Sequence, residues 1–231
     1  MIAVQTDFTT RADEVTRYFQ FLREFDEERV NFVALPTGQS SISSADQVAL
    51  FKTLKANGFL LLYNLVESTV KNAIEAIFDE FKTQGVSFDA CSEEVRKIVL
   101  TNLRHHNVEK ILPALSAISI DVVVATFRKD ELFDGNVDAR RIRKVADNYG
   151  FRSPNGKSDE LLTVKTNRND LAHGNKSFAD VGRDYDVERL EKIKSEVVTF
   201  LEELLDNIAD YITTASYLAS PPQMSSGLSI N

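Results

Sequence analysis

The sequence contains one cysteine, three histidines and no tryptophan in 231 residues. Because Cys91 is the only thiol, the chain cannot form an internal disulfide, which is consistent with a reducing compartment. A structural zinc site is not expected, since His105 and His106 have no cysteine or helically spaced carboxylate beside them. No P-loop or dinucleotide-binding glycine pattern occurs either. We therefore expect no metal and no cofactor.

Helix breakers and long apolar runs are also scarce. The chain has five prolines and nine glycines, whereas 43% of its residues are hydrophobic and 27% are charged, which favours a folded, helix-rich protein. The longest nearly apolar run, GFLLLYNLVESTV, is interrupted by Asn64 and Glu67 and is too short to span a bilayer. The first residues lack the basic and apolar regions of a signal peptide. We expect a cytoplasmic protein without a membrane partner.

Apolar periodicity predicts an all-α fold. The last helical run, expected at about 186–218, has apolar residues spaced three or four apart, as in packed helices. The run at about 45–82 is too apolar for one narrow stripe, so we expect other helices to surround it. Segment 117–127, AISIDVVVATF, fits a strand or a buried helix. Further helices are expected at about 11–35, 92–107, 138–149 and 159–173. We predict an elaborated helical bundle forming one domain over residues 1–217, with a disordered tail at 218–231.

The charge of the chain is unevenly distributed. A net charge of −8 is unfavourable for binding nucleic acid. Residues 138–176, however, contain nine basic and five acidic residues, a net +4, which leaves −12 on the remainder. Arg140, Arg141, Arg143 and Lys144 lie on the short helix expected at 138–149 and are candidates for binding RNA phosphates. The alternative is that these charges only solvate a surface.

The segment TNRNDLAHGNKSF at 166–178 places an arginine and a histidine five positions apart. If 159–173 is one helix, Arg168 falls on the apolar stripe that runs from Leu161 to Leu171. Asn169 and His173, four residues apart, share the neighbouring stripe. An arginine on an apolar face must be paired or must line a cleft, because an unpaired buried charge is strongly destabilising.

These three residues have the chemistry of a phosphodiester-cleaving site. Arg168 would bind the phosphate oxygens and offset their growing charge in the transition state. His173 would transfer a proton, and Asn169 would orient His173 or the phosphate. No metal is needed if the substrate supplies its own nucleophile, as the 2′-hydroxyl of RNA does. The alternative is a histidine that only caps its helix, with an arginine nearby by chance.

The string Arg168-Asn169-x-x-x-His173-Gly174 resembles the motif of the HEPN superfamily, in which four to six residues separate an arginine from a histidine. Residues 60–78 resemble the second helix of that family, the final helix resembles its fourth, and residues 136–151 resemble an insertion found in one branch. The likeness covers most of residues 10–217 and places an insertion at about 119–156. It implies a helical bundle, and many such proteins are metal-independent endoribonucleases of prokaryotic toxin and antiviral systems.

The resemblance also implies partners. Family members commonly form homodimers in which the Arg/His pairs of two chains face one cleft, and many are controlled by an antitoxin or a defence-system protein. Asn175 stands where some branches have a tyrosine that their antitoxin modifies, so that control is not expected here. We predict a toxin or abortive-infection endoribonuclease that cleaves RNA by 2′-hydroxyl attack. The alternative is a catalytically inactive module for dimerisation or partner binding, with Arg168 and His173 in an interface ion network.

A second polar cluster interrupts the most apolar helix. Asn64, Glu67 and Lys71 lie at positions i, i+3 and i+7 of the run at 45–82. We predict that Glu67 pairs with Arg168 and fixes its guanidinium, with Asn64 alongside. The alternative is a polar stripe that reaches solvent between neighbouring helices.

Overall fold

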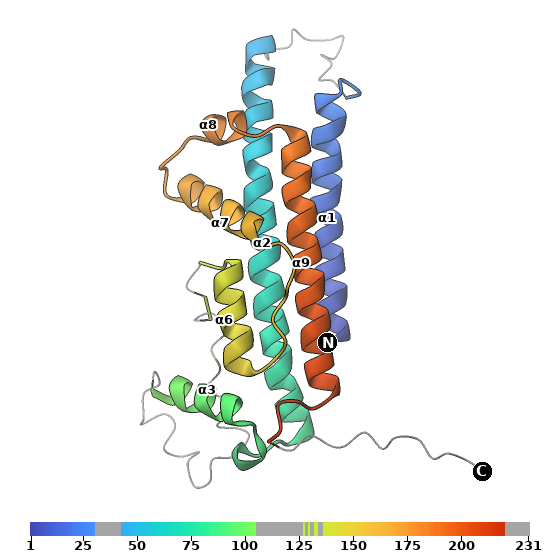
Figure 1. Cartoon of the computed structure of the whole chain (residues 1–231). Helices are drawn as coiled ribbons and strands as arrows, with labels where there is room; N and C mark the ends of the chain where they lie inside the picture. Colours follow the sequence, from blue (N-terminus) through green and yellow to red (C-terminus); the bar gives the residue numbers. More distant parts are fainter. Residues whose placement is uncertain (31–42, 105–126, 128, 130–131, 134–135, 220–231) are drawn as a thin grey trace, which may run out of the picture.

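Three long helices lie side by side, and the longest of them runs the length of the molecule (Figure 1). The computed structural model describes residues 1–30, 43–104, 127, 129, 132–133 and 136–219. Helices α1 (Ile2–Asp26), α2 (Ser44–Gln84) and α9 (Val187–Thr213) form this bundle. Helix α2 contacts α1, α7, α8 and α9, which confirms that the most apolar run is surrounded. The all-α prediction is confirmed.

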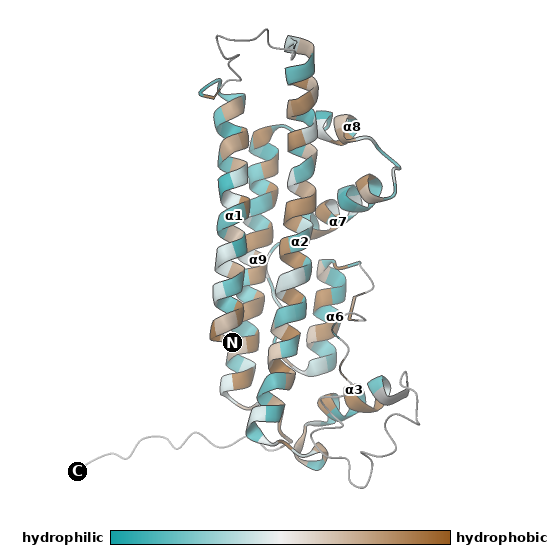
Figure 2. Ribbon diagram, turned by 180° about the vertical axis from the view of Figure 1, so that it is seen from behind, coloured by the Kyte–Doolittle hydropathy of each residue, from teal (hydrophilic) through white to brown (hydrophobic). Residues whose placement is uncertain are grey.

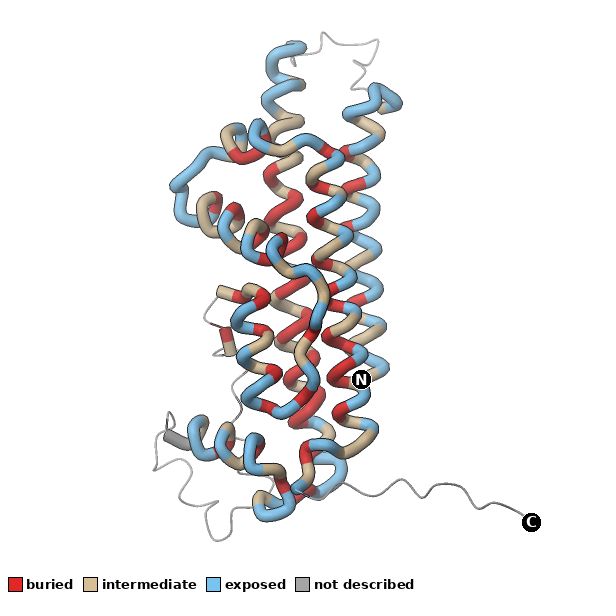
Figure 3. The backbone as a smooth tube through the Cα atoms, viewed as in Figure 1, coloured by how far each residue is buried: buried red, intermediate tan, exposed pale blue. Residues whose placement is uncertain are grey.

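Helix α2 is long because both of its ends are capped and because no residue in its interior interrupts the helix. The Ser43 hydroxyl accepts a hydrogen bond from the backbone of Asp46, and the Asp46 carboxylate accepts one from Ser43, which makes a capping box. The helix ends at Gln84 and is capped by Gly85, whose φ of +60° lies in the left-handed region. Figure 3 shows buried residues along most of its length below the first turns.

Helix α9 follows the predicted packing pattern. The residues that define the pattern are all buried: Leu190, Ile193, Val197, Leu201, Leu204, Ile208 and Tyr211. Asp186 caps the start of the helix by accepting a hydrogen bond from the backbone N–H of Arg189. Hydrophobic and hydrophilic residues alternate in bands along this helix in Figure 2, as expected for an amphipathic bundle helix.

The predicted bounds of the first helix are wrong. Helix α1 begins at Ile2 and ends at Asp26, whereas the pattern predicted residues 11–35. Three threonines in its first turns are poor helix formers in isolation, but their hydroxyls donate to carbonyl oxygens four residues earlier, and Phe8 anchors this part in the core. Just after the helix, Glu28 adopts a φ of +59°, which does not continue it.

Shorter helices complete the domain. Helices α6 (Ala139–Tyr149) and α7 (Asp159–Ala172) lie beside α2, and α3 (Glu93–Arg104) packs against α6 near one end of the molecule (Figure 1). The short 3₁₀ helix η1 (Phe88–Ala90) precedes α3.

Helix α8 (Phe178–Arg183) was not predicted, because six residues are too few for a periodic pattern. It packs tightly on α2 at Gly182, where an added Cβ would lie 1.9 Å from the carbonyl oxygen of Lys52. Only glycine permits this close approach.

Parts of several predictions lie outside the described residues, including positions 105–107 of the third predicted helix, His105 and His106, and segment 117–126. Most of the predicted tail, 220–231, also lies outside them. Its first two residues are bound, since Leu218 forms a bridge with Cys91 and the N–H of Ala219 donates to the carbonyl of Ala90 at 2.9 Å. Within the part of the chain that the structure describes, no helix has the length and apolarity needed to cross a membrane.

Candidate active site

Helix α7 presents the predicted apolar stripe to the bundle. Leu161, Val164 and Leu171 are buried, and Arg168 on the same stripe is half-buried. The position of Arg168 predicted from the spacing is thus confirmed. A charged group at this position needs compensating contacts, since burial without them is costly.

Contacts with Tyr63 and Asn169 hold the guanidinium of Arg168. Its central carbon lies 4.3 Å from the centre of the Tyr63 ring, within the range of a cation–π interaction. Its Nη1 donates a hydrogen bond of 2.9 Å to Oδ1 of Asn169. Tyr63 belongs to α2, so the contact ties the motif helix to the central helix. The ring fixes the plane of the guanidinium and Asn169 fixes one of its edges.

Asn169 is bonded on both sides of its amide. Oδ1 accepts from Arg168, and Nδ2 donates to Oδ1 of Asn136 at 3.1 Å. Asn136 lies in the segment before α6, far from Asn169 in sequence. The structure therefore links Asn169 to the arginine, whereas the sequence predicted a contact with His173 or with a bound phosphate.

His173 lies at the exposed end of α7. It is the C-cap residue, its backbone N–H donates to the carbonyl of Asn169, and its side chain is exposed. Gly174 follows with a φ of +70°, as expected for the residue after a helix C-terminus. The backbone N–H groups of Asn175 and Lys176 both donate to the carbonyl of Asp170, which closes the turn. An imidazole at this turn is accessible to a large polyanion.

A comparison with known families shows where the chain belongs. A model for a family described as HEPN_MAE_28990-like HEPN matches residues 3–217. The chain belongs to this HEPN family. No curated protein and no solved structure matches the chain. HEPN domains are commonly ribonucleases. The Arg168–His173 pair resembles the motif of that superfamily, so it is the first candidate for an active site, and we refer to it below as the HEPN motif.

Tyr63 supports the HEPN motif and was not singled out from the sequence. Its side chain is buried, and its hydroxyl accepts a 3.1 Å hydrogen bond from the backbone N–H of Val137. Burial raises the pKa of Tyr63 and the Glu67 carboxylate adds to this, whereas the hydrogen bond from Val137 and the charges of Arg168 and Lys71 oppose it. The phenol is therefore a neutral support. A tyrosine on an otherwise apolar helix was the available signal, because a buried hydroxyl needs a partner.

The second polar cluster differs from its prediction. The Glu67 carboxylate forms an ion pair with Nζ of Lys71 at 2.9 Å, which corrects the predicted pairing with Arg168. Spacing explains the outcome, because a lysine four residues after a glutamate on one helix is a favourable partner. Asn64 is exposed, so this stripe reaches solvent, as the alternative interpretation stated. Glu67 lies one turn from Tyr63, and its charge raises the pKa of Tyr63.

The four basic residues of α6 divide into two pairs. The guanidinium of Arg141 donates to backbone carbonyls before α6, including that of Phe133 at 2.8 Å. That of Arg143 donates to two carbonyls in the loop before α7 and lies 5.6 Å from the ring of Phe200. Both therefore serve the fold. Arg140, Arg141 and Lys144 are all exposed, but the Arg141 guanidinium is already bonded to backbone carbonyls, so we keep Arg140 and Lys144 as the candidates for RNA binding.

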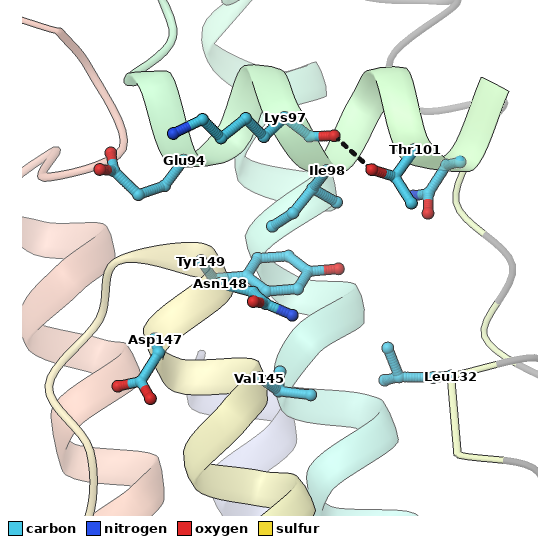
Figure 4. Close-up of a pocket in the computed structure, with 10 residues that line it drawn as sticks. Glu94, Lys97, Ile98, Thr101, Leu132, Val145, Asp147, Asn148 and Tyr149 are labelled. Atoms are coloured by element: carbon cyan, nitrogen blue, oxygen red, sulfur yellow. Dashed lines mark hydrogen bonds between the residues drawn. The ribbon is translucent and has the colours of Figure 1, made fainter. Parts of the chain in front are cut away.

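A pocket of about 530 Å³ lies elsewhere, between α3 and the end of α6 (Figure 4). Its lining includes Glu94, Lys97, Asp147 and Tyr149, with carboxylates and an ammonium group in the same cavity. None of its lining residues is a predicted site residue. The pocket has no group arranged like the HEPN motif, and we assign the candidate chemistry to Arg168 and His173.

Proposed function

We propose that this HEPN protein is a metal-independent endoribonuclease that acts in the cytoplasm as a toxin or antiviral effector. The observation that supports the proposal most directly is the state of Arg168. A half-buried guanidinium, stacked on Tyr63 and bonded to Asn169, is preorganised for an anion. An exposed histidine follows on the same helix, five residues later.

The reaction that fits these groups is an internal transesterification of RNA. The 2′-oxygen attacks the adjacent phosphorus while the bond from phosphorus to the 5′-oxygen breaks. The 2′-hydroxyl loses a proton and the 5′-oxygen gains one, and His173 carries one of these transfers. Arg168 binds the non-bridging oxygens as their charge increases. The products are a 2′,3′-cyclic phosphate and a 5′-hydroxyl, and DNA is not a substrate because it lacks the nucleophile.

We further propose a homodimer in which two motifs face one cleft. Each chain would then contribute one imidazole, and the two imidazoles together would carry the two proton transfers at a single phosphate. Arg140 and Lys144, exposed on the helix next to the motif helix, would bind RNA phosphates beyond the cleavage point. An antitoxin or defence-system protein would control the activity.

The test compares wild type with His173→Ala, both expressed in bacteria and both purified. We expect wild type to inhibit growth and to fragment RNA in the presence of EDTA, and we expect the variant to do neither. The exposed side chain of His173 makes this substitution compatible with folding, which circular dichroism will check.

Equal growth of both strains, with no RNA fragments from either protein, would reject the proposal that the protein is an endoribonuclease. The outcome would then favour a catalytically inactive module for dimerisation or partner binding. Sedimentation of both proteins distinguishes that case, because an interface containing His173 would be weakened by the substitution.

A further inference from the structure

Three consecutive residues before α6 each bond to a different residue around Arg168. Oδ1 of Asn136 accepts from Asn169 at 3.1 Å, and the backbone N–H of Val137 donates to Tyr63 at 3.1 Å. The carboxylate of Asp138 accepts from Nζ of Lys165 at 2.6 Å. We call residues 136–138 the clamp segment. It contacts the motif helix twice and the tyrosine under the arginine once.

The clamp segment is itself fixed on the side away from the motif. The second oxygen of Asp138 caps α6 by accepting from the backbone N–H of Arg141 at 3.0 Å. The Arg141 side chain donates back to the carbonyl of Asn136, and Val137 is buried in the core. The pKa of Asp138 is lowered because hydrogen bonds from Lys165 and the Arg141 backbone outweigh the opposing effect of burial.

The orientation of the Asn169 amide is the property that depends on this segment. A side-chain amide has one oxygen that accepts and one nitrogen that donates. In the structure the oxygen faces the Arg168 guanidinium, which only donates, and the nitrogen faces Asn136. If the amide turned over, its N–H groups would face a guanidinium that offers no acceptor. An acceptor at position 136 favours the orientation that holds Arg168.

We propose that Asn136 is a positioning residue of the HEPN motif, which acts on Arg168 through Asn169. The consequence for cleavage rests on the proposed function. Asn136 need not touch RNA in this role: its oxygen selects the amide orientation, and the amide aligns the arginine with the phosphate. Its removal therefore lowers the rate of the chemical step more than it lowers RNA binding.

The kinetic test uses Asn136→Ala and Asn136→Asp. We expect Asn136→Ala to lower kcat about tenfold with KM nearly unchanged, the size of one lost net hydrogen bond. The Asn136→Asp variant keeps an oxygen acceptor in the same place, so its kcat should recover most of that loss. Asn148→Ala is the matched control, since Asn148 is exposed on α6 and lies outside the clamp segment.

A double variant tests whether Asn136 acts through Asn169. In an Asn169→Ala background, Asn136→Ala should cause no further fall in kcat, because the group that it orients is gone. An equal fall in both backgrounds would overturn the proposal, and so would wild-type kcat in Asn136→Ala itself.

A readout without RNA separates this proposal from the proposed function. The side-chain NH₂ resonances of Asn169 in a ¹⁵N–¹H spectrum should shift in Asn136→Ala and stay in place in Asn148→Ala, with the backbone spectrum checking the fold. Unchanged Asn169 resonances in Asn136→Ala would refute the bond and the proposal. If wild type cleaves no RNA, the proposed function falls, and the spectrum alone decides whether Asn136 orients Asn169.

Discussion

Tyr63 makes two separable contributions, and two substitutions distinguish them. Tyr63→Phe keeps the ring under Arg168 but removes the hydroxyl that accepts from the Val137 N–H. Because Val137 is buried, the loss should lower the free energy of unfolding by about 1–3 kcal/mol. Tyr63→Leu removes the ring as well, and with it a cation–π contact worth about 0.5–2 kcal/mol, in addition to the cost of a smaller side chain.

A double-mutant cycle with Arg168→Met isolates the ring contact. Methionine retains much of the apolar stem of the arginine but carries no charge. The coupling between Tyr63→Leu and Arg168→Met should be about 0.5–2 kcal/mol, whereas the coupling between Tyr63→Phe and Arg168→Met should be close to zero. The assay is urea unfolding followed by far-UV circular dichroism, at one fixed protein concentration because the unfolding of a dimer depends on concentration.

Two results would refute this reasoning. If Tyr63→Phe unfolds at the same urea concentration as wild type, the hydroxyl does not satisfy a buried donor. If the Tyr63→Leu cycle gives a coupling below about 0.3 kcal/mol, the ring does not stabilise the guanidinium.

Three further predictions concern packing, titration and RNA binding. Gly182→Ala should lower the free energy of unfolding by about 1–3 kcal/mol or more, because its Cβ would clash with a backbone carbonyl in α2; Gly174→Asn, where nothing lies within 4 Å and asparagine tolerates the positive φ, is the control and should change little. Asp138→Asn should lower the free energy of unfolding by about 1.5–3 kcal/mol at neutral pH. Because the pKa of Asp138 is lowered in the folded state, its contribution is present above the unfolded pKa of about 3.9 and is lost as the pH falls through the folded value. The difference between the two proteins in urea unfolding should therefore vanish in acid, and a difference that persists there would contradict the ion pair. Replacing Arg140 and Lys144 together with glutamate should weaken RNA binding and reduce the slope of log K against log salt by about 1.4 or more, measured by fluorescence anisotropy; an unchanged slope would exclude both from the binding surface.

Periodicity was sufficient for the elements that carry the motif. The spacing of Leu161 and Leu171 placed Arg168 on the apolar face of α7, and the apolar steps of α9 matched its buried residues. These properties are local, since a helix fixes which side chains share a face. Helix α8 was not predicted, because its position depends on a close approach to α2 at Gly182.

The residues that hold the HEPN motif in place could not be predicted in the same way. Tyr63 and Val137 are separated by 74 positions, and Asn136 and Asn169 by 33, and no local rule states which distant polar groups will meet. Glu67 illustrates the same limit, because a local partner four residues away was available and the structure uses it.

The composition of α6 likewise gives the number of its basic residues, but it does not show what each of them contacts. The guanidinium groups of Arg141 and Arg143 donate to backbone carbonyls, although Arg141 is exposed, as are Arg140 and Lys144. The difference depends on the loops before and after α6, whose carbonyl groups accept hydrogen bonds from these two guanidinium groups.

The most direct test of the account is cleavage of an RNA oligonucleotide by the purified protein in EDTA, with a matched oligonucleotide that lacks only the 2′-hydroxyl at the cleaved position. We expect the first to yield a 2′,3′-cyclic phosphate and a 5′-hydroxyl, and we expect the second to remain intact at that position. Cleavage of both oligonucleotides at the same rate, or a 5′-phosphate at the new end, would contradict a reaction driven by the ribose hydroxyl with Arg168 and His173 as its catalytic groups.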